Sequence, residues 1–269
     1  MWSRAFRALT ITVEVQLDAE VLVPAIVALT GSYPTSSAPP SLVYSVEGSG
    51  PEFRILRDDE VIDEEAPEID VASILEWDML RSCVAEANSC VVLHAAAVRV
   101  ADAVLVMVGP SGAGKTTLTR GLLQTGAEYL SDECVAIDSD GSVSGLARPI
   151  CLEEGEDPTL DASQVHLHRW IDAKDREVSD RFWHPPREES AGVGPGRLKS
   201  LVVVNYVPKS SASREALSSG EALARLWPCV LNPGPSTLDI LTSLVEAGTV
   251  FEVRTSSVDS ACTLARRGL

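Results

Sequence analysis

Residues Gly109 to Thr117 carry the clearest chemistry in this sequence. They read Gly-Pro-Ser-Gly-Ala-Gly-Lys-Thr-Thr and match Gly-x-x-x-x-Gly-Lys-Thr, the pattern of a phosphate-binding loop, or P-loop. The glycines allow backbone N–H groups to turn toward one point and surround phosphate oxygens. We expect Lys115 to reach the β- and γ-phosphates of a nucleotide and the Thr116 hydroxyl to bind Mg²⁺. The candidate nucleotide-binding residues are Gly109, Pro110, Ser111, Gly112, Ala113, Gly114, Lys115, Thr116 and Thr117.

Three polar residues on either side of the P-loop are candidates for catalysis. His94 lies in the apolar segment 91–98, which we expect to form a hairpin with the strand before the loop and so to bring His94 near the nucleotide. Asp132 and Glu133 lie in a strand predicted near 128–137, where one carboxylate could accept a proton from an attacking hydroxyl and the other could hold Mg²⁺. Adjacent strand residues point to opposite faces, so both roles require a bend there. The candidate catalytic residues are His94, Lys115, Asp132 and Glu133, and the candidate metal ligands are Thr116 and Asp132.

The segments around the P-loop predict the elements that must position these residues. The apolar run 103–108 predicts a buried strand that leads into the loop, and 116–125 predicts a helix whose positive N-terminal end favours bound phosphate. Alternating strands and helices continue on both sides, which predicts an α/β fold with a mixed sheet flanked by helices. Further strands are expected at 149–152, 200–206 and 249–254, and further helices at 71–89, 219–227, 236–246 and 257–267.

The first 70 residues predict a smaller α+β region. Its expected elements end at an acidic run, 58–70, which we interpret as a solvated loop, with a docking surface for a basic peptide as the alternative. We therefore expect an N-terminal α+β region over 1–70, a candidate docking region for substrate or partner, and a P-loop domain over 71–269. The predicted elements of the N-terminal region are a strand at 8–16, a helix at 18–30 and a hairpin of strands at 42–47 and 52–56.

Two other classes of P-loop protein fit the sequence poorly. A GTPase needs an Asn-Lys-x-Asp segment that reads guanine, and the nearest segment, 205–209, does not have it. Residues 217–221 resemble the signature of an ABC transporter, but no apolar strand with acidic residues at its end follows them. We interpret 217–221 as a helix N-cap formed by Ser218 or Ser219.

Three blocks of the sequence together resemble the HPr serine kinase/phosphorylase family. They are Leu-His-Ala-Ala-Ala-Val at 93–98, the P-loop itself, and Gly-Ala-Glu-Tyr-Leu-Ser-Asp-Glu at 126–133, and they are closer still to the HPr-kinase-like proteins found beside peptide-modifying gene clusters. The resemblance implies a phosphoenolpyruvate-carboxykinase-like α/β fold that binds Mg-ATP and transfers phosphate to a serine hydroxyl. By this resemblance Lys115 and Thr116 hold phosphate and metal, the acidic pair supplies the base, and His94 supports the site.

Three features depart from that family's pattern. The acidic pair is Asp-Glu where the family has Asp-Asp, which leaves open which carboxylate is the base and which binds metal. The Glu-Ile-Arg-Gly-Leu-Gly segment of the bifunctional enzymes has no clear match, since 145–149 lacks its acidic ligand. Residues 1–80 do not resemble the N-terminal domain of those enzymes. Phosphorylase activity and HPr as substrate therefore stay open.

Composition narrows the choice of partners. A net charge of −17 disfavours nucleic acid and makes a basic or neutral peptide partner easier to accommodate. No apolar run reaches the roughly 18 residues of a membrane span, and no signal peptide is evident at the N-terminus. We expect a cytoplasmic protein with no membrane partner, whose cysteines are reduced core residues. The six cysteines are at 83, 90, 134, 151, 229 and 262.

The residues thus predict an ATP-dependent kinase that phosphorylates a hydroxyl, with a serine of a small protein or precursor peptide as the favoured acceptor. Two alternatives remain open: a kinase of a small hydroxylated metabolite such as a free amino acid, and a nucleotide-dependent switch or scaffold. The resemblance also suggests a homo-oligomer. Extra cations that could stabilise transition-state charge are Arg148, Arg181, Arg187, Arg197 and Lys199.

Overall fold

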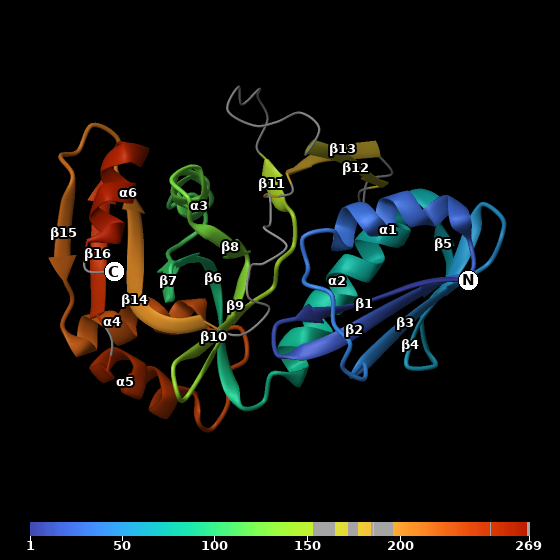
Figure 1. Ribbon diagram of the computed structural model, residues 1–269, viewed down its shortest axis with the longest axis horizontal. Coiled ribbons are helices and arrows are strands. Elements are labelled where there is room, and N and C mark those ends of the chain that lie inside the picture. Colours follow the sequence, from blue (N-terminus) through green and yellow to red (C-terminus); the bar gives the residue numbers. More distant parts are fainter. Residues whose placement is uncertain (153–164, 172–176, 184, 186–195, 248, 268–269) are drawn as a thin grey trace. The chain divides into compact units, whose positions relative to one another are not determined.

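Two stretches of chain make up each of the two units of the protein (Figure 1). The first unit is Met1–Glu86 with Arg148–Pro186, and the second is Ala87–Ala147 with Arg187–Leu269. The computed structural model describes residues 1–152, 165–171, 177–183, 185, 196–247 and 249–267. This division differs from the expected boundary at residue 70, because helix α2 (Glu68–Glu86) packs on the strands of the first unit.

A five-stranded sheet in the order β1-β2-β3-β4-β5 is the centre of the first unit. Neighbouring strands are antiparallel except β2 and β3, which are parallel and are joined through helix α1 (Val23–Thr30), as a parallel connection requires. Alternation positions the core: along β3, Leu42, Tyr44 and Val46 are buried while the residues between them are not. The strands are β1 (Trp2–Ala8), β2 (Ile11–Leu17), β3 (Leu42–Glu47), β4 (Glu52–Arg57) and β5 (Glu60–Pro67). A separate antiparallel sheet contains β11 (Ile150–Leu152), β13 (Glu177–Trp183) and β12 (Val165–Ile171).

The acidic run 58–70 is not a loop, so that prediction is wrong. Most of it forms strand β5, which pairs with β4 through a turn at Asp58 and Asp59, both in the left-handed region with φ of 47° and 67°. Asp tolerates this conformation, and such a turn matches the twist of a hairpin. Because β5 is an edge strand, its acidic side chains can stay in water and also discourage pairing with another chain.

The second unit is built on a mixed sheet in the order β10-β9-β6-β7-β14-β16-β15, with β8 paired to β6. The strands β7, β14 and β16 are parallel, and the others are antiparallel to their neighbours. The expected mixed sheet is confirmed, and the structure adds two short strands, β10 and β15, that the sequence did not predict. The strands are β6 (Cys90–Val100), β7 (Ala103–Val108), β8 (Glu128–Ser131), β9 (Cys134–Asp138), β10 (Ser142–Gly145), β14 (Gly196–Tyr206), β15 (Ser213–Ala216) and β16 (Thr249–Thr255).

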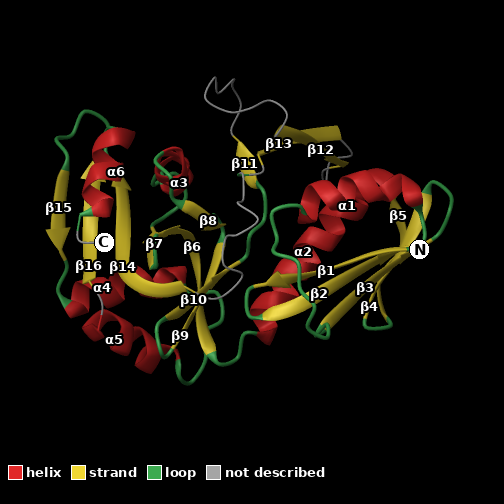
Figure 2. Ribbon diagram, viewed as in Figure 1, coloured by secondary structure: helices red, strands yellow, loops and turns green. Residues whose placement is uncertain are grey.

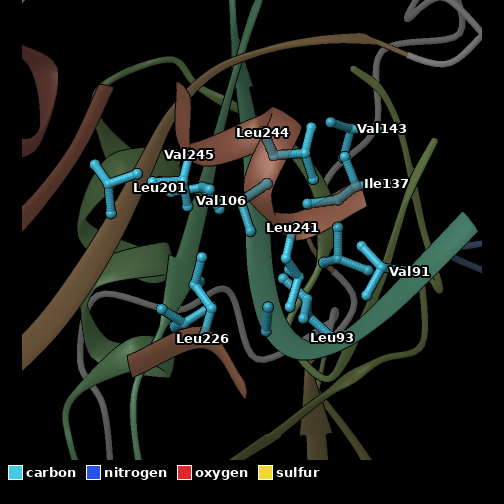
Figure 3. Close-up of a cluster of buried hydrophobic side chains, with 14 of the residues drawn as sticks. Val91, Leu93, Val106, Ile137, Val143, Leu201, Leu226, Leu241, Leu244 and Val245 are labelled. Atoms are coloured by element: carbon cyan, nitrogen blue, oxygen red, sulfur yellow. The ribbon is translucent and has the colours of Figure 1, made fainter. Parts of the chain in front are cut away.

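Helices cover both faces of this sheet, as expected (Figure 2). On one face, Val106 of β7 packs with Leu226 and Leu241 of helices α4 (Ser219–Leu226) and α5 (Thr237–Ala247), in the cluster that Figure 3 shows. On the other face, Leu105 and Met107 pack against α3 (Lys115–Gln124) and α6 (Val258–Arg266). Strand β7 is buried on both faces, which explains why its sequence is apolar throughout. The packed strand fixes the position at which the P-loop begins.

Several smaller expectations can be compared directly with the structure. Ser218 caps α4 in a capping box with Glu221, so the interpretation of 217–221 as an N-cap is confirmed. All six cysteines are free thiols, but Cys151 is exposed and Cys229 only half-buried, so not all are core residues. Among the described helices, none combines the length and apolarity that crossing a bilayer would require.

Candidate functional site

The P-loop turns between the end of β7 at Val108 and the start of α3 at Lys115. Its backbone needs glycine at two points. A Cβ at Gly109 would lie 2.9 Å from the Val204 carbonyl oxygen of β14, and Gly114 precedes the helix with a left-handed φ of 94°. These conformations let the loop reverse direction tightly and begin α3 with its free N–H groups at the loop.

Lys115 lies at the centre of this turn. Its side-chain ammonium donates hydrogen bonds to the carbonyl oxygens of Gly109 at 2.8 Å and Pro110 at 3.3 Å. The residue is only 8% exposed, and the loop is closed further by a hydrogen bond from the Ala113 amide to the Pro110 carbonyl. A nearly buried ammonium held by two neutral carbonyls is a cation positioned for an anion at the loop.

His94 reaches the loop through the hairpin that the sequence predicted. Strands β6 and β7 are antiparallel, and Ala95 stands opposite Val108, so His94 lies at the level where the P-loop begins. Ala96 and Val98 pack toward α3, and alternation places His94 on the same face. The pairing of the two strands is therefore confirmed, and it places His94 at the end of the sheet where the P-loop begins.

The bend that the acidic pair required is present between β8 and β9, at Asp132 and Glu133. The Thr116 hydroxyl donates a hydrogen bond to Asp132 Oδ2 at 2.8 Å. His94 Nε2 lies 3.6 Å from Glu133 Oε1, and both side chains are partly exposed, at 38% and 40%. The structure therefore brings one carboxylate to the start of α3 and the other to the histidine of β6.

Ser131, which was not among the residues predicted from the sequence, holds this bend in place. Its buried hydroxyl lies 2.8 Å from the Cys134 carbonyl oxygen and 2.9 Å from that of Leu146, and it accepts hydrogen bonds from the amides of Cys134 and Glu133. A serine just before an irregular backbone segment is a recognisable signal for such a local network. The partner at Leu146, 15 residues away, is not.

Arg120 is a second residue near the site that was not predicted from the sequence. It lies one helical turn after Thr116 on α3, so both point to the same side of the helix. Burial lowers the pKa of the Arg120 guanidinium, and the charge of Asp132 partly offsets that effect. The structure therefore adds a cation that interacts electrostatically with Asp132, the carboxylate to which Thr116 donates its hydrogen bond. The four-residue spacing from Thr116 was the available signal.

An extended segment after α4 takes the place beside β6 that β7 leaves when it turns into the P-loop. Val230 pairs with Leu93, and the Asn232 side chain accepts a hydrogen bond from the Val92 amide at 2.7 Å. Burial raises the pKa of the Cys229 thiol, while the backbone amide of Gly109 and the charge of Lys115 lower it. The thiol therefore lies within the electrostatic reach of the loop, which its apolar sequence context did not indicate.

Within the described part of the second unit, the expected extra cations Arg197 and Lys199 do not lie at this loop. Arg148 belongs to the first unit and forms a 2.8 Å ion pair with Glu76. Arg197 pairs with Ala103, five residues before the end of β7 and so about 17 Å from the P-loop, and it bonds Asp140 instead. Lys199 follows on the same stretch of β14. The side chains of Arg181 and Arg187 lie outside the described residues.

The oxygen atoms of Thr116 and Asp132 suit a hard cation such as Mg²⁺. In the part of the chain that the structure describes, no three His, Cys, Asp or Glu side chains form a metal-binding group. Mg²⁺ usually keeps several waters and binds one or two carboxylates with substrate phosphates, so this small donor set fits it.

No protein-family model matches this sequence, and no curated protein sequence is similar to it. Among solved structures, the chain is similar to an Hpr(Ser) kinase/phosphatase from Coxiella burnetii, with 10% sequence identity and a TM-score of 0.29. That alignment covers 65% of this chain and 91% of the other. So distant a likeness assigns no chemistry, which has to come from the residues of the site.

Proposed function

We propose that the second unit binds Mg-ATP at residues 109–117 and transfers the γ-phosphate to a hydroxyl, with a serine of a small protein or precursor peptide as acceptor. The observation that carries this proposal is the pair of contacts at one side of the P-loop, Thr116 to Asp132 and His94 to Glu133. A loop that only held nucleotide would need a metal ligand but no second carboxylate beside a histidine.

Each residue then has a role that its position supports. The P-loop amides and Lys115 hold the phosphates, and Asp132 with Thr116 holds Mg²⁺, which when bound offsets charge on the β- and γ-phosphates. Glu133 is left as the base. The acceptor oxygen forms a bond to the γ-phosphorus, the bond from that phosphorus to the β–γ bridging oxygen breaks, the hydroxyl proton passes to Glu133, and ADP leaves.

His94 positions Glu133 in this scheme. Its Nε2 lies 3.6 Å from the carboxylate, which is longer than a hydrogen bond, so we assign it to orientation of Glu133 and not to proton transfer. The peptide acceptor is supported by the net charge of −17, which favours a basic partner, and by the sequence resemblance described above.

Phosphate transfer from labelled Mg-ATP tests the proposal. The full chain is incubated with basic serine peptides, with free serine, or with no acceptor, and products are identified by mass spectrometry. Phosphopeptide formation supports the proposal. Transfer to free serine alone would replace the acceptor with a metabolite. ADP release with no phosphorylated product, together with nucleotide-dependent binding of a partner, would indicate a switch.

Light scattering with and without Mg-ATP tests the expected homo-oligomer.

A further inference from the structure

Tyr206 is an exposed aromatic residue beside the P-loop that the proposed reaction does not use. It ends β14, the neighbour of β7 on the side away from β6. The last paired residue of β7, Val108, stands opposite Val203, so β14 continues three residues, or about 10 Å, past the point where the P-loop begins. Tyr206 therefore lies beside the loop and not beside the sheet below it.

One hydrogen bond attaches Tyr206 to the loop, and its side chain begins close to Gly114. Its backbone amide donates a hydrogen bond to the Ala113 carbonyl at 3.2 Å, and its Cβ lies 3.6 Å from where a Cβ on Gly114 would be. Val202 and Val204 pack toward α3 and α6, so alternation puts the Tyr206 side chain on that same face. The residue is nevertheless 51% exposed, which leaves much of its surface open to a ligand.

The two sides of the P-loop differ in chemistry, and this difference orients a nucleotide. Asp132 and Glu133 lie on the β6 side, so Mg²⁺ and the γ-phosphate belong there. The aromatic base of the nucleotide is attached at the end of the triphosphate away from the γ-phosphate. It should therefore extend from the loop in the direction away from the two carboxylates. On the side away from β6, the next strand is β14, and the residue that rises beside the loop is Tyr206.

We propose that Tyr206 is the platform on which the aromatic base of the nucleotide stacks, so that it sets nucleotide affinity without taking part in phosphate transfer. The proposal rests on the nucleotide-binding function given above. Base–aromatic stacking depends on the faces of the two rings. Phe at position 206 should therefore preserve nucleotide affinity, and an aliphatic residue there should weaken it.

Calorimetric titration of the full chain tests this directly. Mg-ADP and magnesium tripolyphosphate are each titrated into wild type, Tyr206→Leu, Tyr206→Phe and the control Trp77→Leu, which changes an exposed aromatic of the first unit. We expect Tyr206→Leu to raise the Kd for Mg-ADP about tenfold, with Tyr206→Phe and Trp77→Leu within about twofold of wild type. Tripolyphosphate has no base, so its affinity should be the same in all four proteins.

Two results would overturn the platform while leaving the nucleotide site intact. The first is an unchanged Kd for Mg-ADP in Tyr206→Leu. The second is an equal loss of affinity for tripolyphosphate, which would mean that Tyr206 shapes the P-loop and does not contact the base. If wild type binds neither ligand, the nucleotide site itself is wrong and the platform falls with it.

Discussion

Asp78 and Asp132 are both carboxylates that accept a hydrogen bond from a hydroxyl, but their surroundings differ. Asp78, in the first unit, accepts bonds from the Tyr44 hydroxyl at 2.8 Å, from Arg57 at 3.0 and 3.1 Å and from Ser82 at 3.3 Å. All of these partners lie within regular elements. Asp132, in the second unit, lies in a bend between two strands and accepts a hydrogen bond from Thr116 of the P-loop.

These surroundings indicate which carboxylate is structural. The hydrogen bonds of Asp78 connect α2 to β3 and β4, and Tyr44 is fully buried among them. Burial raises the pKa of the Tyr44 hydroxyl, which keeps it a donor to Asp78 in alkaline solution. Asp132 instead joins irregular backbone to a helix start, the kind of position at which binding and catalytic groups concentrate. The first carboxylate should therefore control stability and the second activity.

Lys115→Ala should have the largest effect. Removing a cation held at the transferring phosphate should lower kcat by about 10³-fold or more, since interactions of this kind act mainly in the transition state. The melting temperature should change little. Steady-state kinetics with labelled ATP gives the measurement, and Lys199→Ala is the matched control, because Lys199 lies on β14 well before the strand reaches the loop. Near-normal turnover in Lys115→Ala would show that the P-loop is not the catalytic centre.

Asp132→Asn combined with Glu133→Gln should lower kcat by about 10²-fold or more, through loss of the base and of a metal ligand. The free energy of unfolding should stay close to that of wild type, because the bend is held by Ser131 and not by these carboxylates. Rapid-quench measurement of a single turnover separates this effect from product release. Transfer at the wild-type rate would contradict the assigned roles.

Asp78→Asn should give the opposite result. It removes the charge that Arg57 faces and one acceptor of the Tyr44 bond, so the free energy of unfolding should fall by about 2 kcal/mol. This loss of stability is smaller than for a fully buried ion pair because the side chains of Arg57 and Asp78 both keep contact with water. Hydrogen exchange should show faster opening of α2, while kcat of the folded protein stays unchanged. A loss of kcat with normal stability would mean that the distinction between the two carboxylates is wrong.

Ser131→Ala should have the smallest effect, and it should affect both properties. Loss of a buried hydroxyl with several partners should cost about 1–2 kcal/mol of stability. Because the bend at the acidic pair would relax, kcat should also fall, by about tenfold. Ser82→Ala is the matched control: it removes a buried hydroxyl bonded to Arg57 and Asp78 in the first unit, and it should cost stability alone. Equal kcat in the two variants would show that Ser131 does not position the carboxylates.

The sequence predicted the local structure around the candidate site well. The P-loop, the strand and helix that hold it, the hairpin of His94 and the need for a bend at Asp132 all follow from patterns within about 40 residues. The errors lie where the pattern is short or polar. Strand β5 is acidic, and β10 and β15 have four residues each, so their pairing with neighbours outweighs their weak local preference.

The tight glycine-rich turn at 109–117 and the strand and helix around it can be inferred from the sequence, because glycine geometry and strand and helix periods act between near neighbours. Only tertiary packing places 148–186 in the first unit, makes β14 the strand beside the loop, and brings Arg120 within reach of the charge of Asp132. It also decided that Tyr206 stands at the opposite side of the loop from the carboxylates. These arrangements depend on which distant strands and helices pack together to bury their apolar faces, and no short pattern encodes that choice.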